Sequence, residues 1–476
     1  METTLLKEFI REELCDIAGH EAVVTSKAEL FTYGADYFWI PRVWMDRGAE
    51  PMLPDYLVTA DTVEKVSAIL KLANRYKIPV IPYAGGTGVN GGIIAVHGGI
   101  MLDIKNLNQL VEIDDKSLTV TAQAGINGQL LEWELNRRGL TLAHYPASQY
   151  GATLGGYVAA RGSGTLSTKY GKAEDMVLRM EVVLPSGEVI ETLPVPSHST
   201  GPNLHHLFMG TEGTYGVITE LTMRVDPLPE VREFQGYLFD DLETALEAGR
   251  LIMAKRLNPC TIRLYDPPST VRFIKGVLGI DVEGSFLVIG CDGSRGMVDL
   301  QKKEIDAICT SMKGKDIGPE PGEIWWRDRY KFYFPPFCPN LPELFGTMDS
   351  VTTFDKIYDL YKAKRKAIEG GYKDFGARYT AHFSHWFPWG VMIYDRFFVE
   401  KPPHDPREAL QLHNRMWADG VRASLATGGV INEHHGIGLK LGSFMPEQYG
   451  ASWPVLTGIK KMLDPNNIMN PGKLGF

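Results

Sequence analysis

Apolar and polar positions follow helical spacing in some segments and strand spacing in others. Thr62–Tyr76 carries apolar residues at helical spacing, and Ile78–Pro82 then predicts a short strand. Residues 174–192, EDMVLRMEVVLPSGEVIET, predict a β-hairpin that turns at Ser186 and Gly187. The first part of the chain is therefore expected to be a strand-rich scaffold.

A glycine-rich loop follows the first predicted strand. Residues 82–92 read PYAGGTGVNGG and contain G-x-G-x-x-G from Gly86 to Gly91. A dinucleotide-binding Rossmann unit needs a long helix directly after this motif. Residues 92–107, GIIAVHGGIMLDIKNL, instead predict strand, turn and strand, with Asp103 closing the second strand. The motif is therefore not a Rossmann signature, but its exposed backbone N–H groups suit phosphate oxygens.

Two more stretches of the same kind follow. Residues 146–164 read PASQYGATLGGYVAARGSG, and residues 210–218 read GTEGTYGVI. Three separated loops rich in Gly, Ser and Thr on strand-rich scaffolding indicate one long ligand that is held from several sides.

The pattern changes at about Pro227. Residues 242–256 and 352–371 are predicted to be helical, and residues 285–293 and 391–398 to be strands. Glycine-rich segments return near the C-terminus. We expect three regions: a first domain over residues 1–225, a second α+β domain over 226–424, and a segment, 425–476, that returns to the first domain.

Composition narrows the class of protein. The 476 residues suggest two to three domains, and the net charge of −9 without a Lys/Arg stripe disfavours nucleic acid or an anionic membrane as partner. The five cysteines form no C-x-x-C, which argues against a disulfide framework, a zinc knuckle or an iron–sulfur cluster within the chain. The N-terminus has no signal-peptide pattern, and no apolar run approaches the roughly 20 residues of a membrane span. We expect a reduced, cytoplasmic, soluble enzyme.

Five ordered motifs between about Pro54 and Phe476 resemble the flavoprotein family named for vanillyl-alcohol oxidase and para-cresol methylhydroxylase (PCMH). They are PYAGGTGVNGG, PASQYGATLGG, the ARGSG…YG run, GTEGTYGVITE, and HHGIG with LDPNNIMNPGK. The resemblance implies an α+β, two-domain flavoprotein. A PCMH-type FAD-binding domain would hold the cofactor. An α+β cap domain, an antiparallel sheet flanked by helices, would cover the flavin ring and supply most of the substrate pocket.

The resemblance also implies which residues hold FAD in an extended form. The expected FAD-binding residues are Ala84, Gly85, Gly86, Thr87, Gly88, Val89, Asn90, Pro146, Ala147, Ser148, Ala152, Thr153, Gly155, Ala160, Gly162, Ser163, Glu212, Gly213, Gly216, Val217, Ile218 and Asn470. Residues 84–90 would surround the pyrophosphate, and Asn470 would lie near the ring. Relatives with covalent FAD often place a histidine in or near the first loop. This loop has none, so noncovalent FAD is expected.

Two branches of the family compete. GIG after the histidines and LDPNNIMNPGKL resemble the D-lactate and glycolate dehydrogenases. Residues 199–220, STGPNLHHLFMGTEGTYGVITE, and W-x-x-R-Y at Trp326–Tyr330 resemble alkyl-dihydroxyacetonephosphate synthase, as does Ser384-His385 ahead of Tyr394. The synthase usually has three consecutive histidines, but Glu433 replaces the first here. It is also commonly longer and carries a peroxisomal signal, which the ending KLGF is not.

The hydroxy-acid branch usually binds a divalent metal through H-x-G-D-G-x-x-H and a glutamate. In this chain the first histidine is His385, but the second position falls on Met392, and a thioether is a poor ligand for a hard metal. The glutamate position is His434, with Glu433 one residue away. A metal held by His385, His434 and Glu433 stays open.

Oxidation of a 2-hydroxy acid needs a hydride acceptor, a base and a cation for the carboxylate. The flavin N5 would accept hydride, and His435, beside His434, would be the base. Arg329 in WWRDRYKF would clamp a carboxylate or phosphate, with Arg327 and Arg378 as rivals and a surface salt bridge as the alternative interpretation. Tyr394 would polarise the substrate oxygen, unless it is a core aromatic residue.

The preferred hypothesis is an FAD-dependent dehydrogenase of a small or moderately hydrophobic 2-hydroxy acid. Its electrons would pass to a quinone, an electron-transfer flavoprotein or an iron–sulfur subunit, and a homodimer is compatible with it. The alternative is a transferase like the ether-lipid synthase, which uses FAD without net redox change.

Overall fold

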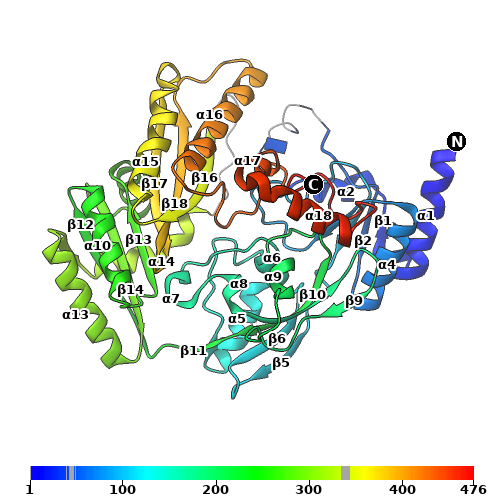
Figure 1. Cartoon of the computed structure of the whole chain (residues 1–476), viewed down its shortest axis with the longest axis horizontal. Coiled ribbons are helices and arrows are strands. Elements are labelled where there is room, and N and C mark those ends of the chain that lie inside the picture. Colours follow the sequence, from blue (N-terminus) through cyan, green and yellow to red (C-terminus); the bar gives the residue numbers. More distant parts are fainter. Residues whose placement is uncertain (1, 39, 42–44, 46–47, 49, 334–343) are drawn as a thin grey trace. The chain divides into compact units, whose positions relative to one another are not determined.

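The computed structural model describes residues 2–38, 40–41, 45, 48, 50–333 and 344–476, and these form two compact units (Figure 1). Unit 1 comprises Met1–Gly162, Lys172–Pro227 and His434–Phe476, and unit 2 comprises Ser163–Gly171 and Leu228–Glu433. Of the five cysteines, Cys338 lies outside the described residues, and the other four are buried and free.

Unit 1 contains a small parallel sheet that ends at the first glycine-rich loop. Its strand order is β1-β2-β4-β3, with β2, β4 and β3 parallel and β1 antiparallel to β2. Its strands are β1 (Val23–Val24), β2 (Tyr56–Thr59), β3 (Val80–Tyr83) and β4 (Ile100–Asp103), and its helices are α1 (Glu2–Ala18), α2 (Lys27–Thr32) and α4 (Val63–Tyr76). Thr62 caps α4 by accepting a hydrogen bond from the Lys65 N–H.

The larger sheet of unit 1 is antiparallel, with strand order β5-β6-β10-β8-β9. Its strands are β5 (Leu110–Asp114), β6 (Thr119–Gln123), β8 (Val177–Val183), β9 (Val189–Glu191) and β10 (Val217–Arg224); a separate pair joins β7 (Leu140–Thr141) to β11 (Asp226–Pro227). The remaining helices of the unit are α5 (Gly128–Arg137), α6 (Leu154–Ala159), α8 (Ala173–Met176), α9 (Leu204–Phe208), α17 (Met445–Tyr449) and α18 (Trp453–Leu463).

Unit 2 is built on a seven-stranded antiparallel sheet with order β15-β12-β14-β13-β17-β18-β16 (Figure 1). Its strands are β12 (Val231–Phe239), β13 (Thr261–Tyr265), β14 (Ser285–Gly293), β15 (Lys315–Gly318), β16 (Leu344–Thr353), β17 (Ala377–Trp386) and β18 (Gly390–Val399). Its helices are α7 (Ser167–Tyr170), α10 (Leu242–Ala254), α11 (Pro267–Ser269), η2 (Thr270–Lys275), α12 (Gly276–Leu278), α13 (Arg295–Ser311), α14 (Glu320–Asp328), η3 (Arg329–Phe332), α15 (Ile357–Arg365) and α16 (Pro406–Ala426).

The two faces of this sheet differ. Helices α10, α13, α15 and α16 pack on one face, where Lys364 of α15 forms a buried ion pair with Asp395 of β18 at 2.6 Å. On the other face α14 covers β12 and β14, with Trp325 in an apolar cluster that includes Phe286 and Val288. The part of this second face formed by β13, β17 and β18 carries polar side chains.

Several expectations from the sequence are confirmed. The helix before the glycine-rich loop, the strand that leads into it and the hairpin at Gly187 are present, and the predicted strand over residues 285–293 coincides with β14. No helix occurs among residues 84–99, so the Rossmann interpretation is excluded. Among the described residues, no helix is both long and apolar enough to cross a membrane.

Two local predictions are wrong. Of the two strands expected over residues 92–107, only the second is present, as β4, because residues 92–99 form turns. The helix expected over residues 352–371 begins only at Ile357, because Thr352 and Thr353 end β16 and pair with Val391 and Gly390. The π-helical turn Lys366–Gly370 continues α15.

Candidate active site

The first two glycine-rich loops meet in unit 1. Residues 84–90 follow β3, and a Cβ on Gly85 would lie 2.4 Å from the carbonyl oxygen of Gly151 in the second loop. Only glycine allows this approach. A Cβ on Gly151 would in turn lie 3.1 Å from the Thr87 methyl group. The loop expected to hold the pyrophosphate and the second loop therefore form one surface.

A buried carboxylate fixes the chain that leads into the second loop. Glu132 of α5 accepts hydrogen bonds from the Leu142 N–H at 3.0 Å and from the Tyr145 hydroxyl at 2.8 Å. After the loop, Thr153 caps α6 by accepting from the Gly156 N–H. The loop is thus held between a helix and a helix cap, which makes a rigid ligand platform.

Helix α6 divides the stretch of residues 146–164 into a second loop, residues 146–153, and a third loop, residues 160–164, so residues 210–218 form the fourth loop. The third and fourth loops are joined by the backbone. The Glu212 N–H donates to the Ala159 carbonyl at 3.0 Å, beside Ala160 and Gly162. Glu212 and Gly213 precede β10, which contains Val217 and Ile218. All the predicted FAD-binding residues except Ser163 therefore lie in unit 1, and Ser163 begins the excursion of the chain into unit 2.

Asn470 connects the first and fourth loops. Its side-chain amide donates to the Gly92 carbonyl at 2.8 Å and to the Glu212 carbonyl at 2.7 Å. Its own N–H donates to Val80 at the start of β3, at 2.8 Å. The Oδ1 atom of Asn470 is buried and has no hydrogen-bond partner within the described structure. A buried amide oxygen without a donor can accept a hydrogen bond from a bound group.

Glu212 also fixes the segment that carries the candidate base. Its Oε2 accepts from the Gly438 N–H at 2.6 Å, and a Cβ on Gly436 would lie 1.8 Å from its Oε1. Asn90 donates to the Gly436 carbonyl at 2.5 Å. The residue after His435 is therefore held by two of the predicted FAD loops.

Burial shifts the pKa values of two ionisable groups near these loops, Glu212 and Lys473. It raises the pKa of Glu212 to about 7, opposed by the Gly438 hydrogen bond and by Lys473. Burial also lowers the pKa of Lys473 to about 8, opposed by the charges of Glu212 and Asp36. Lys473 donates to the Ile94 carbonyl at 2.6 Å. Two groups with displaced pKa values beside a glycine-rich platform are typical of a functional site.

These features fit FAD. The loops lack side chains where a diphosphate would approach, they converge within one unit, and Asn470 offers an unsatisfied acceptor. Bare backbone N–H groups bind phosphate oxygens without a helix N-terminus.

The polar face of unit 2 carries an arginine that the sequence did not single out. His382 of β17 pairs with Tyr394 of β18, and Thr380 pairs with Arg396, so Tyr394 and Arg396 point to the same face as His382. The Arg396 guanidinium stacks over the ring of Phe273 at 4.5 Å and over that of Tyr394 at 4.9 Å. Arg396 is only 9% exposed, and no carboxylate of the described chain pairs with it.

A second arginine lies on the same face. Arg263 of β13 donates from Nη1 to His382 Nε2 at 3.0 Å, and its guanidinium lies 5.8 Å from the Trp325 ring. The imidazole of His382 stacks on Tyr394 at 4.8 Å with an angle of 18° between the planes. Burial raises the pKa of Tyr394, with Arg396 opposing, so this hydroxyl stays neutral near pH 7.

The arginines predicted from sequence are placed differently. Arg329 stacks over Trp326 at 3.6 Å and donates to the Trp326 carbonyl, at the junction of α14 and η3. Arg327 pairs with Asp328 at 2.9 Å and Arg378 pairs with Glu400 at 2.9 Å, both with mostly exposed side chains. The surface-salt-bridge interpretation therefore holds for Arg327 and Arg378, and the role of Arg329 stays a prediction.

The metal candidates are divided between the units. In unit 2, His385 lies at a β-bulge with φ of 51°, and its Nδ1 is 3.0 Å from Glu433 Oε2. The Ser163 hydroxyl donates to the same carboxylate at 3.2 Å. His434 lies in unit 1, where its ring is 4.1 Å from that of His435. Unit 2 thus holds a buried histidine–carboxylate pair, and a metal stays a prediction.

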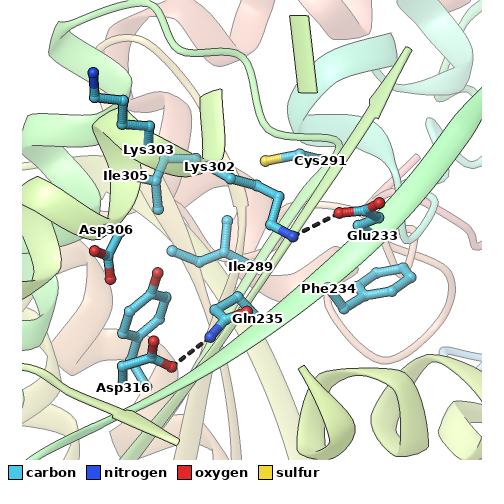
Figure 2. Close-up of a pocket in the computed structure, with 11 residues that line it drawn as sticks. Glu233, Phe234, Gln235, Ile289, Cys291, Lys302, Lys303, Ile305, Asp306 and Asp316 are labelled. Atoms are coloured by element: carbon cyan, nitrogen blue, oxygen red, sulfur yellow. Dashed lines mark hydrogen bonds and ion pairs between the residues drawn. The ribbon is translucent and has the colours of Figure 1, made fainter. Parts of the chain in front are cut away.

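Unit 2 also contains a cavity of about 220 Å³ between α13 and the sheet (Figure 2). It opens on the helix-covered face, away from Arg396. Figure 2 shows Lys302 directed at Glu233, with 2.6 Å between Nζ and Oε2, and Gln235 directed at Asp316. These charges are already paired, and none of the predicted site residues lines the cavity. We therefore assign no role in the site to it.

Comparison with protein families gives two matches that together cover most of the chain. Residues 54–193 match the FAD binding domain, and residues 228–474 match the C-terminal domain of FAD linked oxidases. The first match contains the first three glycine-rich loops, and the second contains the polar face with Tyr394 and the histidines.

Three relatives illustrate the range of this group. The chain is 29% identical over 474 residues to alkyldihydroxyacetonephosphate synthase of Trypanosoma brucei brucei, covering 93% of this chain and 76% of that protein. It is 29% identical over 493 residues to the FAD-linked oxidoreductase YgcU of Escherichia coli K12, covering 99% of each. It is 28% identical over 429 residues to a mitochondrial D-lactate dehydrogenase (cytochrome) of Arabidopsis thaliana, covering 89% of this chain and 73% of that protein.

Solved structures show the same fold. A structure of alkyldihydroxyacetonephosphate synthase superposes with a TM-score of 0.80 at 25% identity, over 98% of this chain and 84% of that chain. A structure of p-cresol methylhydroxylase superposes with a TM-score of 0.76 at 18% identity, over 98% of this chain and 96% of that chain. The expected PCMH-type fold with FAD as cofactor is thereby confirmed, and the chain belongs to the FAD-linked oxidase family.

Proposed function

We propose that this chain is an FAD-dependent dehydrogenase that oxidises a 2-hydroxy acid, D-lactate- or glycolate-like or bulkier. The observation that carries the proposal is the buried guanidinium of Arg396 beside Tyr394. A buried cation without a carboxylate partner among the described residues is costly unless an anionic ligand compensates it. A carboxylate is the complement of a guanidinium, because two N–H groups can donate to its two oxygens.

Each residue of the proposed site then has a separate role in the oxidation. Bound FAD supplies the hydride acceptor. Arg396 binds the substrate carboxylate, in the role first expected of Arg329, and the neutral hydroxyl of Tyr394 donates to the substrate oxygen. His435, with His434 beside it, takes the hydroxyl proton, since a neutral imidazole is matched to neutral pH.

Partners follow from the chemistry. A dehydrogenase of this kind has to pass its electrons on, to a quinone, an electron-transfer flavoprotein or an iron–sulfur subunit, and we propose that it works in the cytoplasm. The D-lactate dehydrogenase among the relatives supports oxidation of a hydroxy acid.

The test of the anion site is Arg396→Met. We expect KM for the hydroxy acid to rise roughly 10- to 100-fold, because a hydrogen bond to a charged group contributes about 1.5–3 kcal/mol. The FAD content should stay unchanged. Arg250→Met is the matched control, because Arg250 forms only a surface pair with Glu247. Equal KM values for the Arg396 variant and the control would refute the assignment.

The alternative is a transferase like the ether-lipid synthase, with FAD but no net redox change. The similarity to alkyldihydroxyacetonephosphate synthase at 29% identity favours it, and an arginine-bearing face also suits a phosphate. The synthase reaction leaves the flavin oxidised after turnover and exchanges a fatty alcohol into acyl-dihydroxyacetonephosphate. Bleaching of the flavin by a hydroxy acid under anaerobic conditions supports the dehydrogenase instead.

A further inference from the structure

We propose that Asp349 is a positioning residue for the oxidation: its carboxylate fixes the peptide bond that leads into His434 and His435, and with it the placement of the base. The proposal deepens the proposed function and rests on it, because His435 is the group that takes the hydroxyl proton. In this role Asp349 acts through the backbone and not through a contact with the substrate.

The segment that precedes the two histidines is held by an edge strand. β16 is the last strand in the order of the seven-stranded sheet, and an edge strand leaves groups that a loop can cover. Beyond α16, residues 428–433 take this place. The Thr352 hydroxyl donates to the Gly428 carbonyl at 2.9 Å, and the Ser350 hydroxyl donates to the Val430 carbonyl at 2.6 Å. β16 therefore holds the segment at successive points.

Asp349 makes the contact of β16 that lies nearest to the histidines. Its Oδ2 accepts from the Glu433 N–H at 2.7 Å, and its Oδ1 accepts from the Asn432 side-chain amide at 3.0 Å. Asp349 is 2% exposed, so water competes little for these donors. Hydrogen bonds to a carboxylate are about twice as strong as those between neutral groups. The peptide bond between residues 432 and 433 is therefore fixed in position and direction.

The chain has a second fixed point just after the two histidines. The Gly436 carbonyl accepts from the Asn90 side chain at 2.5 Å. Only His434 and His435 separate Gly436 from Glu433. A catalytic group has to be held within about 0.5 Å of its productive geometry, and a residue between two close fixed points meets this need. Loss of the fixed point at Glu433 would release one end of this short stretch.

A counter-charge role is the competing explanation for Asp349. It pairs in register with Tyr394, so its side chain shares a face of the sheet with Tyr394 and Arg396. As a counter-charge it would act on how tightly an anionic substrate binds, and every variant without the charge would change KM. As a positioning residue it acts on the rate after binding, and variants differ by how many of the two hydrogen bonds they keep.

The first experiment compares two variants of the FAD-bound full-length protein. Asp349→Ala loses both acceptors, whereas Asp349→Asn keeps one oxygen that can accept from the Glu433 N–H. We expect kcat for a hydroxy acid to fall roughly 10- to 100-fold in Asp349→Ala, because misplacement of a reacting group by about 1 Å has an effect of this size. Asp349→Asn should keep part of the lost rate, with KM and FAD content unchanged in both. Asp355→Ala, at an exposed aspartate just after β16, is the control.

A double-mutant cycle shows whether Asp349 acts through the base. If Asp349 positions His435, adding Asp349→Ala to His435→Ala lowers the residual rate little further, because the group that it positions is already absent. If the two losses multiply, Asp349 acts independently of His435 and the proposal is overturned. A raised KM of equal size in Asp349→Ala and Asp349→Asn, with kcat unchanged, also overturns it and supports the counter-charge.

Amide hydrogen exchange tests the backbone contact without a substrate. We expect the peptide that contains Glu433 to exchange faster in Asp349→Ala than in the wild type, and at the wild-type rate in Asp355→Ala. If Asp349→Ala does not fold, Asp349→Asn replaces it in the cycle and in the exchange measurement, because it also loses a hydrogen bond. If no hydroxy acid reduces the flavin, the proposed dehydrogenase falls, and exchange alone then decides whether Asp349 fixes the segment. Unchanged exchange at Glu433 overturns the positioning role, whatever the reaction.

Discussion

Asn470 donates its side-chain amide to the backbone carbonyl of Glu212 at 2.7 Å, across 258 residues of sequence. Through this bond the C-terminal segment holds the fourth glycine-rich loop, and through Gly92 it holds the first. Both loops belong to unit 1, so the contact organises the predicted FAD platform from within one unit.

Replacing Asn470 should weaken FAD binding. Asn470→Ala removes two hydrogen bonds of about 1 kcal/mol each and places alanine at φ of 41°, a conformation that asparagine tolerates better. We expect the FAD dissociation constant to rise roughly 10- to 100-fold. Asn466→Ala, which changes an exposed residue bonded to Asn74, should leave it unchanged. An unaltered constant in Asn470→Ala would remove this residue from the cofactor site.

Glu212 should make the stability of the FAD-free protein depend on pH. Burial raises the pKa of its carboxyl from 4.5 to about 7, so the folded protein binds more protons than the unfolded chain between these values. The free energy of unfolding therefore falls as the pH rises through this window, by at most about 1.4 kcal/mol per unit. Lys473 stays protonated there, because its pKa is about 8.

The comparison protein is Glu212→Gln, which cannot titrate. Thermal unfolding midpoints measured from about pH 5 to about pH 7 should decline more steeply in the wild type than in the variant. Parallel declines would mean that the Glu212 carboxyl does not titrate in this window.

His435→Ala should stop flavin reduction while FAD stays bound. Loss of a positioned base typically lowers the rate 10²- to 10⁴-fold. His20→Ala changes an exposed histidine of unit 1 and serves as control. Stopped-flow absorbance of the flavin measures the rate, and a normal rate in His435→Ala would exclude it as the base.

The buried pair of Lys364 and Asp395 should be costly to break. The two groups are 1% and 0% exposed and lie 2.6 Å apart, while burial raises the pKa of Asp395 to about 6 in spite of Lys364. Lys364→Met leaves an uncompensated buried carboxyl and should destabilise unit 2 by about 3–5 kcal/mol. Lys362→Met, at an exposed pair with Asp359, should cost less than about 0.5 kcal/mol. Denaturant unfolding measures the free energy of unfolding of both variants. Equal losses in the two would contradict the conclusion that the buried pair of Lys364 and Asp395 stabilises unit 2.

Metal should not be required for turnover. The second histidine position of the hydroxy-acid branch is Met392, which is buried in β18, and its thioether is a poor ligand for a hard metal. We expect the rate of flavin reduction to survive treatment with a chelator. Loss of the rate, together with recovery on adding a divalent metal and one equivalent of metal in the purified protein, would establish a metal site.

The sequence predicted the local elements of unit 1 well, because their signals are local. The hairpin pattern of residues 174–192, the helical spacing of Thr62–Tyr76 and the glycine-rich loop are each read within a few residues. The strand β14 was equally clear, since turn residues bound its continuous apolar run.

The arginine face could not be predicted in the same way. Nearly every position of β18 is buried, so its sequence shows no alternation to say which face Arg396 takes. Arg263 gains its meaning only from the pairing of β13 with β17, which joins residues more than one hundred positions apart. Arg329 was favoured because the aromatic residues around it are visible in the sequence. Its ring contacts are with Trp326 and Tyr330, which are its neighbours on the chain.

The assignment of Ser163–Gly171 to unit 2 also depends on contacts between residues that are far apart in the sequence. Lys169 and Tyr170 are held by the buried Asp292 at 2.7 and 3.0 Å, more than 120 residues along the chain. Nothing within the ARGSG…YG stretch reveals this partner, so the expected FAD residue Ser163 was placed with its sequence neighbours.

The most direct measurement is anaerobic mixing of the purified, FAD-loaded protein with 2-hydroxy acids while the visible absorbance of the flavin is followed. We predict that at least one acid bleaches the flavin within a turnover time and that the oxidised product, a 2-oxo acid, appears in equal amount. A flavin that stays oxidised with every acid, while a fatty alcohol is exchanged into acyl-dihydroxyacetonephosphate, would contradict the proposed dehydrogenase.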